Sequence, residues 1–374
     1  MKYIAFCDID KYKSENRSVA PSASNVVKYM ADVFSEKGEV EIISPARTLN
    51  KKGFYKGRKD KLSDKISLVQ PPTFGASNPL TRVLAVLYTK LWLFFYLLVH
   101  LKKDESIVVY HSLSYMKMLT FFKKLKNLSV ILEIREIYAD INKVSEKMKQ
   151  SEQEFFRIAD KYIFATGILD DIINTEKKPS LIASGIYKPE KTICDKHNDS
   201  KIHVVYAGTL RPEKGGAIST VKMAACLPDN YHVHILGYGS QENIEMVKSL
   251  IADTQSEGRA TISYDGVLSG NEFLSFLQKC DIGVAIQNME GAFNNTSFPS
   301  KVLTYLSNGL DVLSTDIPAV SKSGVGEIIY YCSNNKPEDM AKVLLSIDAG
   351  APVSKEKVLI KLDSDLRRDI LSFW

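Results

Sequence analysis

The chain has few residues of the kinds that build disulfide frameworks or cysteine-ligated metal sites. Its five cysteines, in 374 residues, are scattered without CxxC or any other metal-ligand spacing. This pattern excludes a disulfide scaffold and a cysteine-built metal site, and it predicts reduced thiols in a cytosolic protein. We expect neither a metal ion nor another cofactor. The opening residues KYIAFC read as a strand with no cleavage-like pattern behind them, so no signal peptide is expected.

Long hydrophobic runs are also missing. The most apolar segment, Val83–Leu101, is interrupted by Lys90 and His100, and its unbroken run is Leu91–Val99. That run is well short of the roughly 20 residues that a membrane-spanning helix needs. A membrane-spanning helix is therefore disfavoured. Two interpretations of this segment remain: a helix buried in the core, and a helix that lies in the membrane interface.

Positive charge is concentrated in the first half of the chain. Residues 1–190 contain 31 Lys and Arg against 22 Asp and Glu, or +9, which leaves 18 against 22, or −4, for the remainder. A basic half implies an anionic partner such as a membrane surface or a phosphorylated acceptor. No aromatic-interleaved basic motif of the RNA-binding kind is present, so we expect no nucleic acid. The run Lys51–Lys65 and the pair Lys102–Lys103 favour the membrane surface, since each nearby basic residue adds about 1 kcal/mol on anionic lipid.

Strand-like and helix-like segments alternate along the chain, which predicts an α/β protein with doubly wound parallel sheets. A polar stretch near residues 188–201 divides the pattern into two halves of similar size. We predict domains at 1–190 and 201–352, a linker at 191–200, and a final helix at 353–374 that packs back on the first domain. A ligand is expected in the crevice between the domains, at the carboxyl ends of the strands. In the first half, a loop is expected over Asp8–Ser24 and a helix over Asn25–Lys37.

The segment FPSKVLTYLSNG (298–309) predicts a helix that begins after a Pro-Ser-Lys turn and ends at Gly309. Its start combines free backbone N–H groups, a hydroxyl and a lysine, which suits a phosphate group. A second segment, AGTLRPEKGG (207–216), follows a predicted strand with small residues, Arg211 and Lys214. Together the two segments predict a cradle for a diphosphate, although a basic, glycine-rich loop is also ordinary in any α/β fold.

Four segments of the second half occur in an order similar to that of the GT-B glycosyltransferases, in particular the retaining group called family four. They are AGTLRPEKG, HILGYGS, YDGVLSGNEFLSFLQKCDIGVAIQ and FPSKVLTYLSNGLDVLSTD. The first half resembles the family through its strand order, ILEIRE and SLIASGIY. The resemblance implies two Rossmann-like domains that face a central cleft, with a nucleotide diphosphate sugar in the second domain and a sugar acceptor in the first.

The same resemblance implies the donor-binding residues. Lys214 matches the phosphate-binding lysine of the family. The position of the family's usual arginine holds Thr209, so Arg211, two residues further on, would have to reach the phosphate in its place. The two glutamates of the family are replaced by Thr296 and Thr304, with Glu290 as a possible substitute for the first. The full donor set is Gly208, Thr209, Arg211, Lys214, Gly237, Tyr238, Glu290, Thr296, Ser297, Phe298, Pro299, Ser300, Lys301 and Thr304.

The first half is expected to hold the acceptor. Arg135 and Glu136 stand where the family places a charged pair facing the reacting sugar, so with Lys214 they form the expected catalytic set; an ion pair that caps a sheet edge is the alternative. His111 ends another predicted strand. The acceptor set is Arg17, Ser22, Ala23, Ser24 and His111.

The resemblance implies a retaining hexosyltransferase, and the basic first half and the apolar helix suggest polysaccharide synthesis of the capsule or O-antigen type. The leaving diphosphate would itself take the acceptor proton, so no metal or protein nucleophile is needed. A lipid-diphosphate-linked glycan acceptor and a peripheral position on the membrane are expected with it. Open alternatives are a non-catalytic sugar- or nucleotide-binding homologue and a UDP-sugar 2-epimerase. The Asp8-Ile9-Asp10 motif also resembles those of GT-A enzymes and haloacid-dehalogenase-type phosphatases, but both fit poorly. Tyr12 stands where the phosphatases have Thr or Val, and a GT-A enzyme would place its nucleotide-binding half first, with the motif deep within it.

Overall fold

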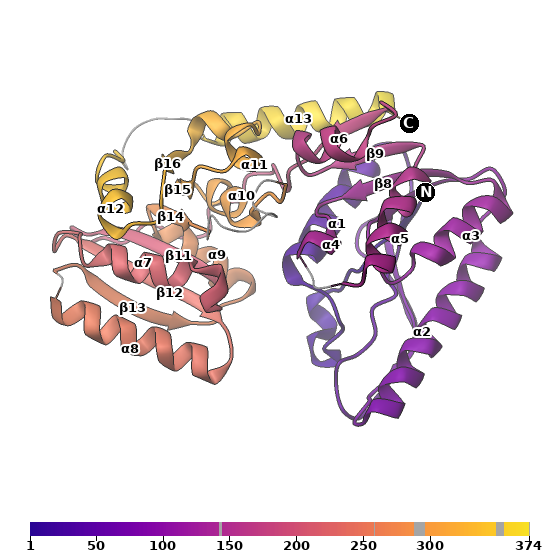
Figure 1. Ribbon diagram of the computed structural model, residues 1–374, viewed down its shortest axis with the longest axis horizontal. Helices are drawn as coiled ribbons and strands as arrows, with labels where there is room; N and C mark the ends of the chain where they lie inside the picture. The colour runs from indigo at the N-terminus through magenta and orange to yellow at the C-terminus, as the bar shows by residue number, and fades with distance from the viewer. Residues whose placement is uncertain (142–143, 258, 288–295, 349–354, 374) are drawn as a thin grey trace. The chain divides into compact units, whose positions relative to one another are not determined.

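The computed structural model describes residues 1–141, 144–257, 259–287, 296–348 and 355–373. Two compact units form: unit 1 contains Met1–Ile186 and Asp365–Trp374, and unit 2 contains Tyr187–Ser364. Each unit is built around one largely parallel sheet with helices against it (Figure 1). The final helix, α13 (Lys355–Phe373), contributes its first part to unit 2 and its last part to unit 1.

Unit 1 contains an eight-stranded sheet in the order β10-β9-β8-β7-β1-β2-β5-β4. All neighbouring strands are parallel except β4, which pairs antiparallel with β5. The strands are β1 (Lys2–Ile4), β2 (Val40–Ile43), β4 (Arg58–Lys61), β5 (Ile66–Gln70), β7 (Ser106–Tyr110), β8 (Ser129–Ile134), β9 (Lys161–Phe164) and β10 (Ser180–Ile182), with β3 (Phe54–Tyr55) and β6 (Thr73–Phe74) in a separate ribbon. The helices are η1 (Asp10–Glu15), α1 (Pro21–Phe34), α2 (Pro79–His100), α3 (Met116–Lys126), α4 (Tyr138–Ile141), α5 (Glu146–Arg157) and α6 (Gly167–Ile173).

Helix α1 begins four residues earlier than the sequence predicts. Pro21 occupies its first turn, where the fixed φ of proline suits a helix and its missing N–H costs nothing. The small residues that follow therefore belong to the helix, and the predicted loop Asp8–Ser24 is interrupted by η1 and ends at Ala20. Ser22–Ser24 thus lie in the first turn of α1.

Helix α2 differs from an ordinary amphipathic helix, because two opposite faces of it are apolar. One face (Ala85, Thr89, Leu93 and Leu97) is buried at a spacing of four residues in the core that α2 shares with α3 and the sheet. The opposite face exposes a continuous apolar stripe, which consists of Leu80, Leu84, Leu87, Leu91, Phe95 and Leu98. Among the described residues, α2 is the one helix long and apolar enough to cross a membrane. Its buried face shows that it also belongs to the core of unit 1.

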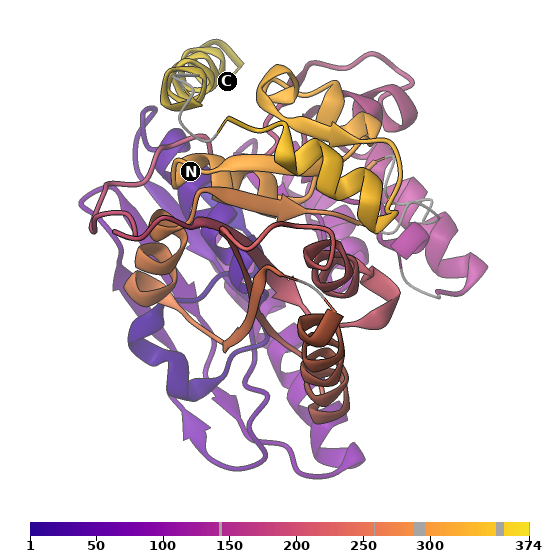
Figure 2. The ribbon, with the colours of Figure 1, turned by 90° about the vertical axis from the view of Figure 1, so that its left-hand side faces the viewer.

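Unit 2 contains a six-stranded parallel sheet in the order β13-β12-β11-β14-β15-β16. Its strands are β11 (Ile202–Thr209), β12 (Tyr231–Tyr238), β13 (Thr261–Gly266), β14 (Ile282–Ala285), β15 (Asp311–Thr315) and β16 (Tyr330–Cys332). Helix α12, amber in Figure 2, packs against β16 and α7. The helices are η2 (Pro212–Lys214), α7 (Gly216–Ala224), α8 (Gln241–Glu257), α9 (Gly270–Lys279), α10 (Ser300–Ser307), α11 (Pro318–Ser321), η4 (Gly326–Ile328) and α12 (Pro337–Leu345).

Candidate functional site

The two predicted phosphate-binding segments of unit 2 meet in the structure. Strand β11 lies between β12 and β14, so its carboxyl end adjoins the segment that leads into α10. The Lys301 ammonium of α10 lies 3.7 Å from the centre of the Tyr206 ring of β11. A Cβ atom on Gly208 would stand 2.6 Å from Lys301 Nζ, so the missing side chain at Gly208 makes room for the ammonium. Lys301 therefore lies over the end of β11.

The charge of Lys301 is not balanced by an acid among the described residues. Burial, and then the neighbouring Lys214, lower the pKa of Lys301 to about 7. No carboxylate of the described residues forms an ion pair with Lys301, whose close contact is the face of the Tyr206 ring. A buried ammonium close to a second cation is unfavourable in the free protein, and an anion would relieve that cost. The electrostatics therefore indicate an anion site.

Two helix starts add backbone donors to the same edge of the sheet. Gly215, with a φ of +69°, turns the chain from η2 into α7, and Pro299 precedes the first turn of α10. Among the described residues neither helix has a side-chain cap, and an uncapped helix start suits an anion. Gly216 is required by space, because a Cβ there would lie 2.6 Å from Tyr206 Cε2 and 2.7 Å from the Ile286 carbonyl oxygen.

The residues before α10 include a hydroxyl without a partner. The Oγ atom of Ser297 is buried and makes no hydrogen bond to the described residues. Buried polar atoms are nearly always paired, so a polar ligand would suit this hydroxyl. Thr296 is buried, whereas Ser300 is exposed. Glu290 lies outside the described residues.

Thr304, which stands in the place of a family glutamate, donates its hydroxyl hydrogen to the Ser300 carbonyl oxygen at 3.0 Å. Its oxygen lone pairs are then left to accept a bond. Arg211 and Lys214 are exposed around η2, and Tyr238 is 58% exposed at the end of β12. Gly237 must lack a side chain, since a Cβ would lie 2.0 Å from the Gly208 carbonyl oxygen. The Thr209 carbonyl accepts a 3.0 Å bond from Tyr206 Oη, which fixes the turn.

In unit 1, Arg135 is held in a buried network that the sequence did not reveal. Its guanidinium forms an ion pair with Glu133, which is fully buried on β8, and bonds to the Ala183 carbonyl. Glu133 Oε2 also accepts a hydrogen bond from Tyr3 Oη of β1. An ion pair was foreseen as the alternative for this region, and the acid that pairs with Arg135 is Glu133. Glu133 was missed because the segment ILEIRE, in which apolar and charged residues alternate, resembles an ordinary strand.

Glu136 is half-buried just beyond the end of β8. His111 follows β7, the neighbouring strand, and its backbone N–H donates to the Glu133 carbonyl at 2.8 Å. Burial lowers the pKa of His111 to about 4, so the ring is neutral at pH 7. Its Nε2 lies 3.3 Å from Glu152 Oε1, without hydrogen-bond geometry, and its ring packs against Phe156. His111 is thus 1% exposed and lies beneath the strand ends rather than open to solvent.

Arg17 holds together the loops beyond β1. It is 4% exposed and donates to Glu15 and to the carbonyl oxygens of Ala46 and Pro71. Ser24 is also committed, because its hydroxyl donates to the Asp8 carbonyl and accepts from the Asp8 N–H. Of the expected acceptor residues, Ser22 is exposed and Ala23 is half-buried at the start of α1.

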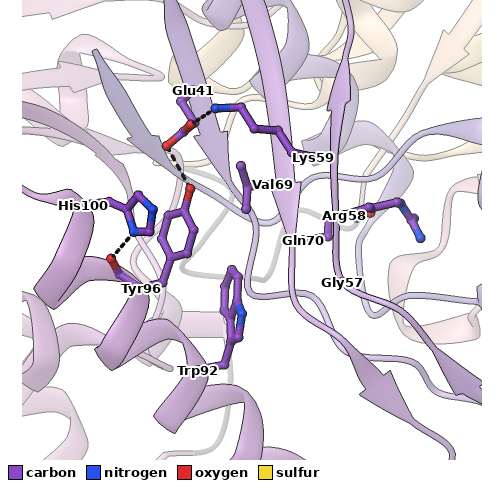
Figure 3. Close-up of a pocket in the computed structure, with 9 residues that line it drawn as sticks. All are labelled: Glu41, Gly57, Arg58, Lys59, Val69, Gln70, Trp92, Tyr96 and His100. Atoms are coloured by element: carbon purple, nitrogen blue, oxygen red, sulfur yellow. Dashed lines mark hydrogen bonds and ion pairs between the residues drawn. The ribbon is translucent and has the colours of Figure 1, made fainter.

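A pocket of about 380 Å³ lies elsewhere in unit 1, between β4, β5 and α2 (Figure 3). Its carboxylate, Glu41, forms ion pairs with Lys2 and Lys59 and accepts a bond from Tyr96 Oη. Burial opposes ionisation of Glu41, but the two lysines prevail and lower its pKa to about 2. The basic run Lys51–Lys65 is therefore partly neutralised within the fold.

Neither a protein-family model nor a curated protein matches the sequence. Solved structures match it over its whole length. The structure described as "Trehalose-6-phosphate from E. coli bound with UDP-2-fluoro glucose" has a TM-score of 0.66 at 8% identity and covers 100% of this chain and 98% of that chain. The chain has the GT-B fold.

Two further structures share this fold. An α,α-trehalose-phosphate synthase (UDP-forming) from Burkholderia xenovorans, in complex with glucose-6-phosphate, has a TM-score of 0.63 at 10% identity and covers 99% of this chain and 97% of that chain. Sucrose-phosphate synthase from Thermosynechococcus elongatus has a TM-score of 0.63 at 11% identity and covers 100% of this chain and 95% of that chain. The expected GT-B architecture is confirmed, while identities this low carry no more than the fold.

Proposed function

We propose that this protein is a retaining glycosyltransferase that moves a hexosyl unit from a nucleotide diphosphate sugar to a glycan acceptor. The observation that carries the proposal is Lys301, an ammonium group placed over the end of β11 beside Lys214 and without an acidic partner among the described residues. A diphosphate supplies the negative charge that this arrangement lacks. Proteins of the same fold bind UDP-2-fluoro glucose and glucose-6-phosphate, which fits a nucleotide-sugar donor and a sugar acceptor.

The proposed chemistry requires charge stabilisation rather than a protein nucleophile. As the bond between the anomeric carbon and the diphosphate breaks, negative charge grows on the leaving oxygen. Lys301, Lys214 and the first N–H groups of α7 and α10 would stabilise that charge, and Arg211 would assist from the loop. The leaving diphosphate would take the proton of the acceptor hydroxyl, and the acceptor oxygen would bond to the same face of the sugar, which retains the configuration.

The acceptor is assigned to the strand ends of unit 1. We place Glu136, beyond β8, at the acceptor or the donor sugar, because it is half-buried and lies next in the chain to the anchored Arg135. Arg135 would act by fixing this turn, since its guanidinium is already bonded to Glu133 and Ala183. His111 and Arg17 would likewise support the loops, whereas the exposed Ser22 and the half-buried Ala23 would border the acceptor.

A membrane-associated acceptor is part of the proposal. The apolar stripe of α2 would enter the interfacial layer of a membrane, with Lys102 and Lys103 at the anionic headgroups. Such a position suits a lipid-diphosphate-linked glycan and a role in cell-surface polysaccharide synthesis. In vesicle sedimentation, Leu91→Asp with Phe95→Asp should abolish binding to anionic vesicles. Val267→Asp, at an exposed apolar residue of unit 2, should leave it unchanged. Equal binding of both variants would remove the membrane from the proposal.

The function itself is tested with a panel of UDP- and GDP-sugars. Thermal unfolding should reveal one nucleotide sugar that stabilises the protein, since a ligand that binds only the native state raises its stability. Slow release of nucleoside diphosphate from that donor, without acceptor, should follow. Binding without any turnover would favour the alternative of a non-catalytic nucleotide-sugar-binding protein. Conversion to the 2-epimer without acceptor would favour an epimerase.

A further inference from the structure

Four of the six histidines of the chain gather at one place in unit 2, away from the anion site. His203 is the second residue of β11 and pairs in register with His232 of β12, while His234 lies two residues further along the same strand face. The fourth, His197, stacks on His203 with ring centres 4.0 Å apart. The cluster therefore lies at the amino ends of the strands, whereas Gly208 and Gly237 mark the carboxyl ends.

Two carboxylates orient two of these rings. Asp199 Oδ1 lies 3.0 Å from His203 Nε2, and Asp265 Oδ2 lies 3.2 Å from His234 Nδ1. A carboxylate accepts hydrogen bonds, so each ring places its N–H on the side of its acid. Ser263 Oγ strengthens this arrangement by donating to Asp265 at 2.9 Å.

The remaining nitrogens of the two rings then face each other. His203 Nδ1 and His234 Nε2 are 2.9 Å apart, and both rings are almost fully buried. A neutral imidazole carries one N–H. When both rings are neutral and both N–H groups are directed at the acids, two lone pairs oppose one another, and a cation beside them converts this repulsion into attraction.

The third ring completes a ligand set. His203, His232 and His234 each offer a nitrogen, and these three atoms all lie within 4.8 Å of one another. Zinc–imidazole bonds are about 2.0–2.1 Å long, so tetrahedral ligand nitrogens lie about 3.3 Å apart, and the rings would turn to bring the three nitrogens to that separation when the ion binds. Metal-ligating histidines usually donate their second N–H to a carboxylate, as His203 and His234 do.

We propose that His203, His232 and His234 bind one divalent transition-metal ion, with zinc as the best-suited metal. Asp199 and Asp265 orient the ligands, and a water or His197 takes the fourth position. The ion ties β11 to β12 at the end opposite the proposed donor site, so its role is structural. The sequence hides this site because HVVY and HVH lie on separate strands, and only their register brings the rings together.

Calorimetric titration of ZnCl₂ into the chelator-stripped full chain tests the proposal. We expect one site per chain and a zinc-dependent rise in melting temperature. His232→Gln, at a half-buried position that tolerates a polar side chain, should weaken zinc binding at least tenfold, and Asp265→Asn by about 10- to 100-fold. The control His100→Gln, in unit 1, should bind zinc as the wild type does. UDP binding in the absence of zinc should be unchanged in His232→Gln.

A cobalt titration gives a second readout that a general loss of stability cannot imitate. Tetrahedral coordination by nitrogen should give visible absorption in the wild type and in His100→Gln, and none in His232→Gln. Equal zinc affinity of the wild type and His232→Gln, or the absence of any stoichiometric binding, would overturn the proposal. The two facing nitrogens would in that case share a proton instead.

Discussion

Lys301 and Arg135 are both cations that lie partly inside a unit, yet their surroundings are opposite. Arg135 is surrounded by acceptors: the fully buried Glu133 and the Ala183 carbonyl. Burial acts to lower its pKa, but Glu133 prevails and raises it. Lys301 has an aromatic face and a second lysine nearby, and its pKa is lowered to about 7. The first charge is satisfied by the fold, whereas in the proposed function the second is satisfied by the diphosphate of the donor.

The largest expected effect is on stability and concerns the ion pair of Arg135 with Glu133. Glu133→Ala leaves Arg135 buried without its acid and removes the acceptor of Tyr3, so it should destabilise the protein by about 3–5 kcal/mol. Urea unfolding measures this loss. Glu154→Ala, at an exposed position of α5, is the matched control and should change stability by no more than about 0.5 kcal/mol. A loss below about 1 kcal/mol for Glu133→Ala would show that the network is not important for folding.

A smaller effect is expected at Gly208, where space rather than charge is altered. In Gly208→Ala the new Cβ would stand 2.6 Å from Lys301 Nζ and displace the ammonium. Losing one hydrogen bond to a charged group costs about 1.5–3 kcal/mol, so nucleoside diphosphate affinity should fall roughly 10- to 150-fold. Gly309→Ala, with open space at its Cβ, is the control for a general glycine effect, although its φ of +85° will lower stability. Unchanged affinity in Gly208→Ala would separate Lys301 from the diphosphate.

The smallest expected effect is the pH dependence of the free protein. Because the folded pKa of Lys301 lies near 7, below the usual 10.5, the unfolded chain binds more protons between these values. The contribution of Lys301 to stability therefore rises with pH from about 7 to 10.5. Lys301→Met should remove this slope and raise the melting temperature of the free protein at pH 7. Lys342→Met, at an exposed position of α12, should change neither. A lower melting temperature for Lys301→Met would contradict the account.

The sequence was enough to predict the alternating architecture and to select the two segments, 207–216 and 298–309, that meet in unit 2, because strand–helix alternation and helix starts are local signals. Lys301, Lys214 and Gly208 were selected as candidates for this reason, and their role in donor binding stays a prediction. Glu133, Tyr206 and the histidine cluster were not, since each acts through a neighbour on another strand that only the register supplies. The sequence left the choice between a buried and an interfacial helix undecided for α2, because composition does not reveal which of its two apolar faces packs against the core. The early start of α1 was missed because Pro-Ser-Ala-Ser resembles a loop as much as a first turn.

The most direct test of the central claim is the proton balance of nucleoside diphosphate binding. Whichever of UDP and GDP binds more tightly is titrated at pH 8 in two buffers of different ionisation enthalpy. A diphosphate beside Lys301 raises the pKa of the ammonium, so wild-type binding should take up a proton and weaken as pH rises from 7 to 9. Lys301→Met should bind at least tenfold more weakly and take up no proton, while Lys342→Met should match the wild type. Equal affinity and equal proton uptake in Lys301→Met would contradict the account.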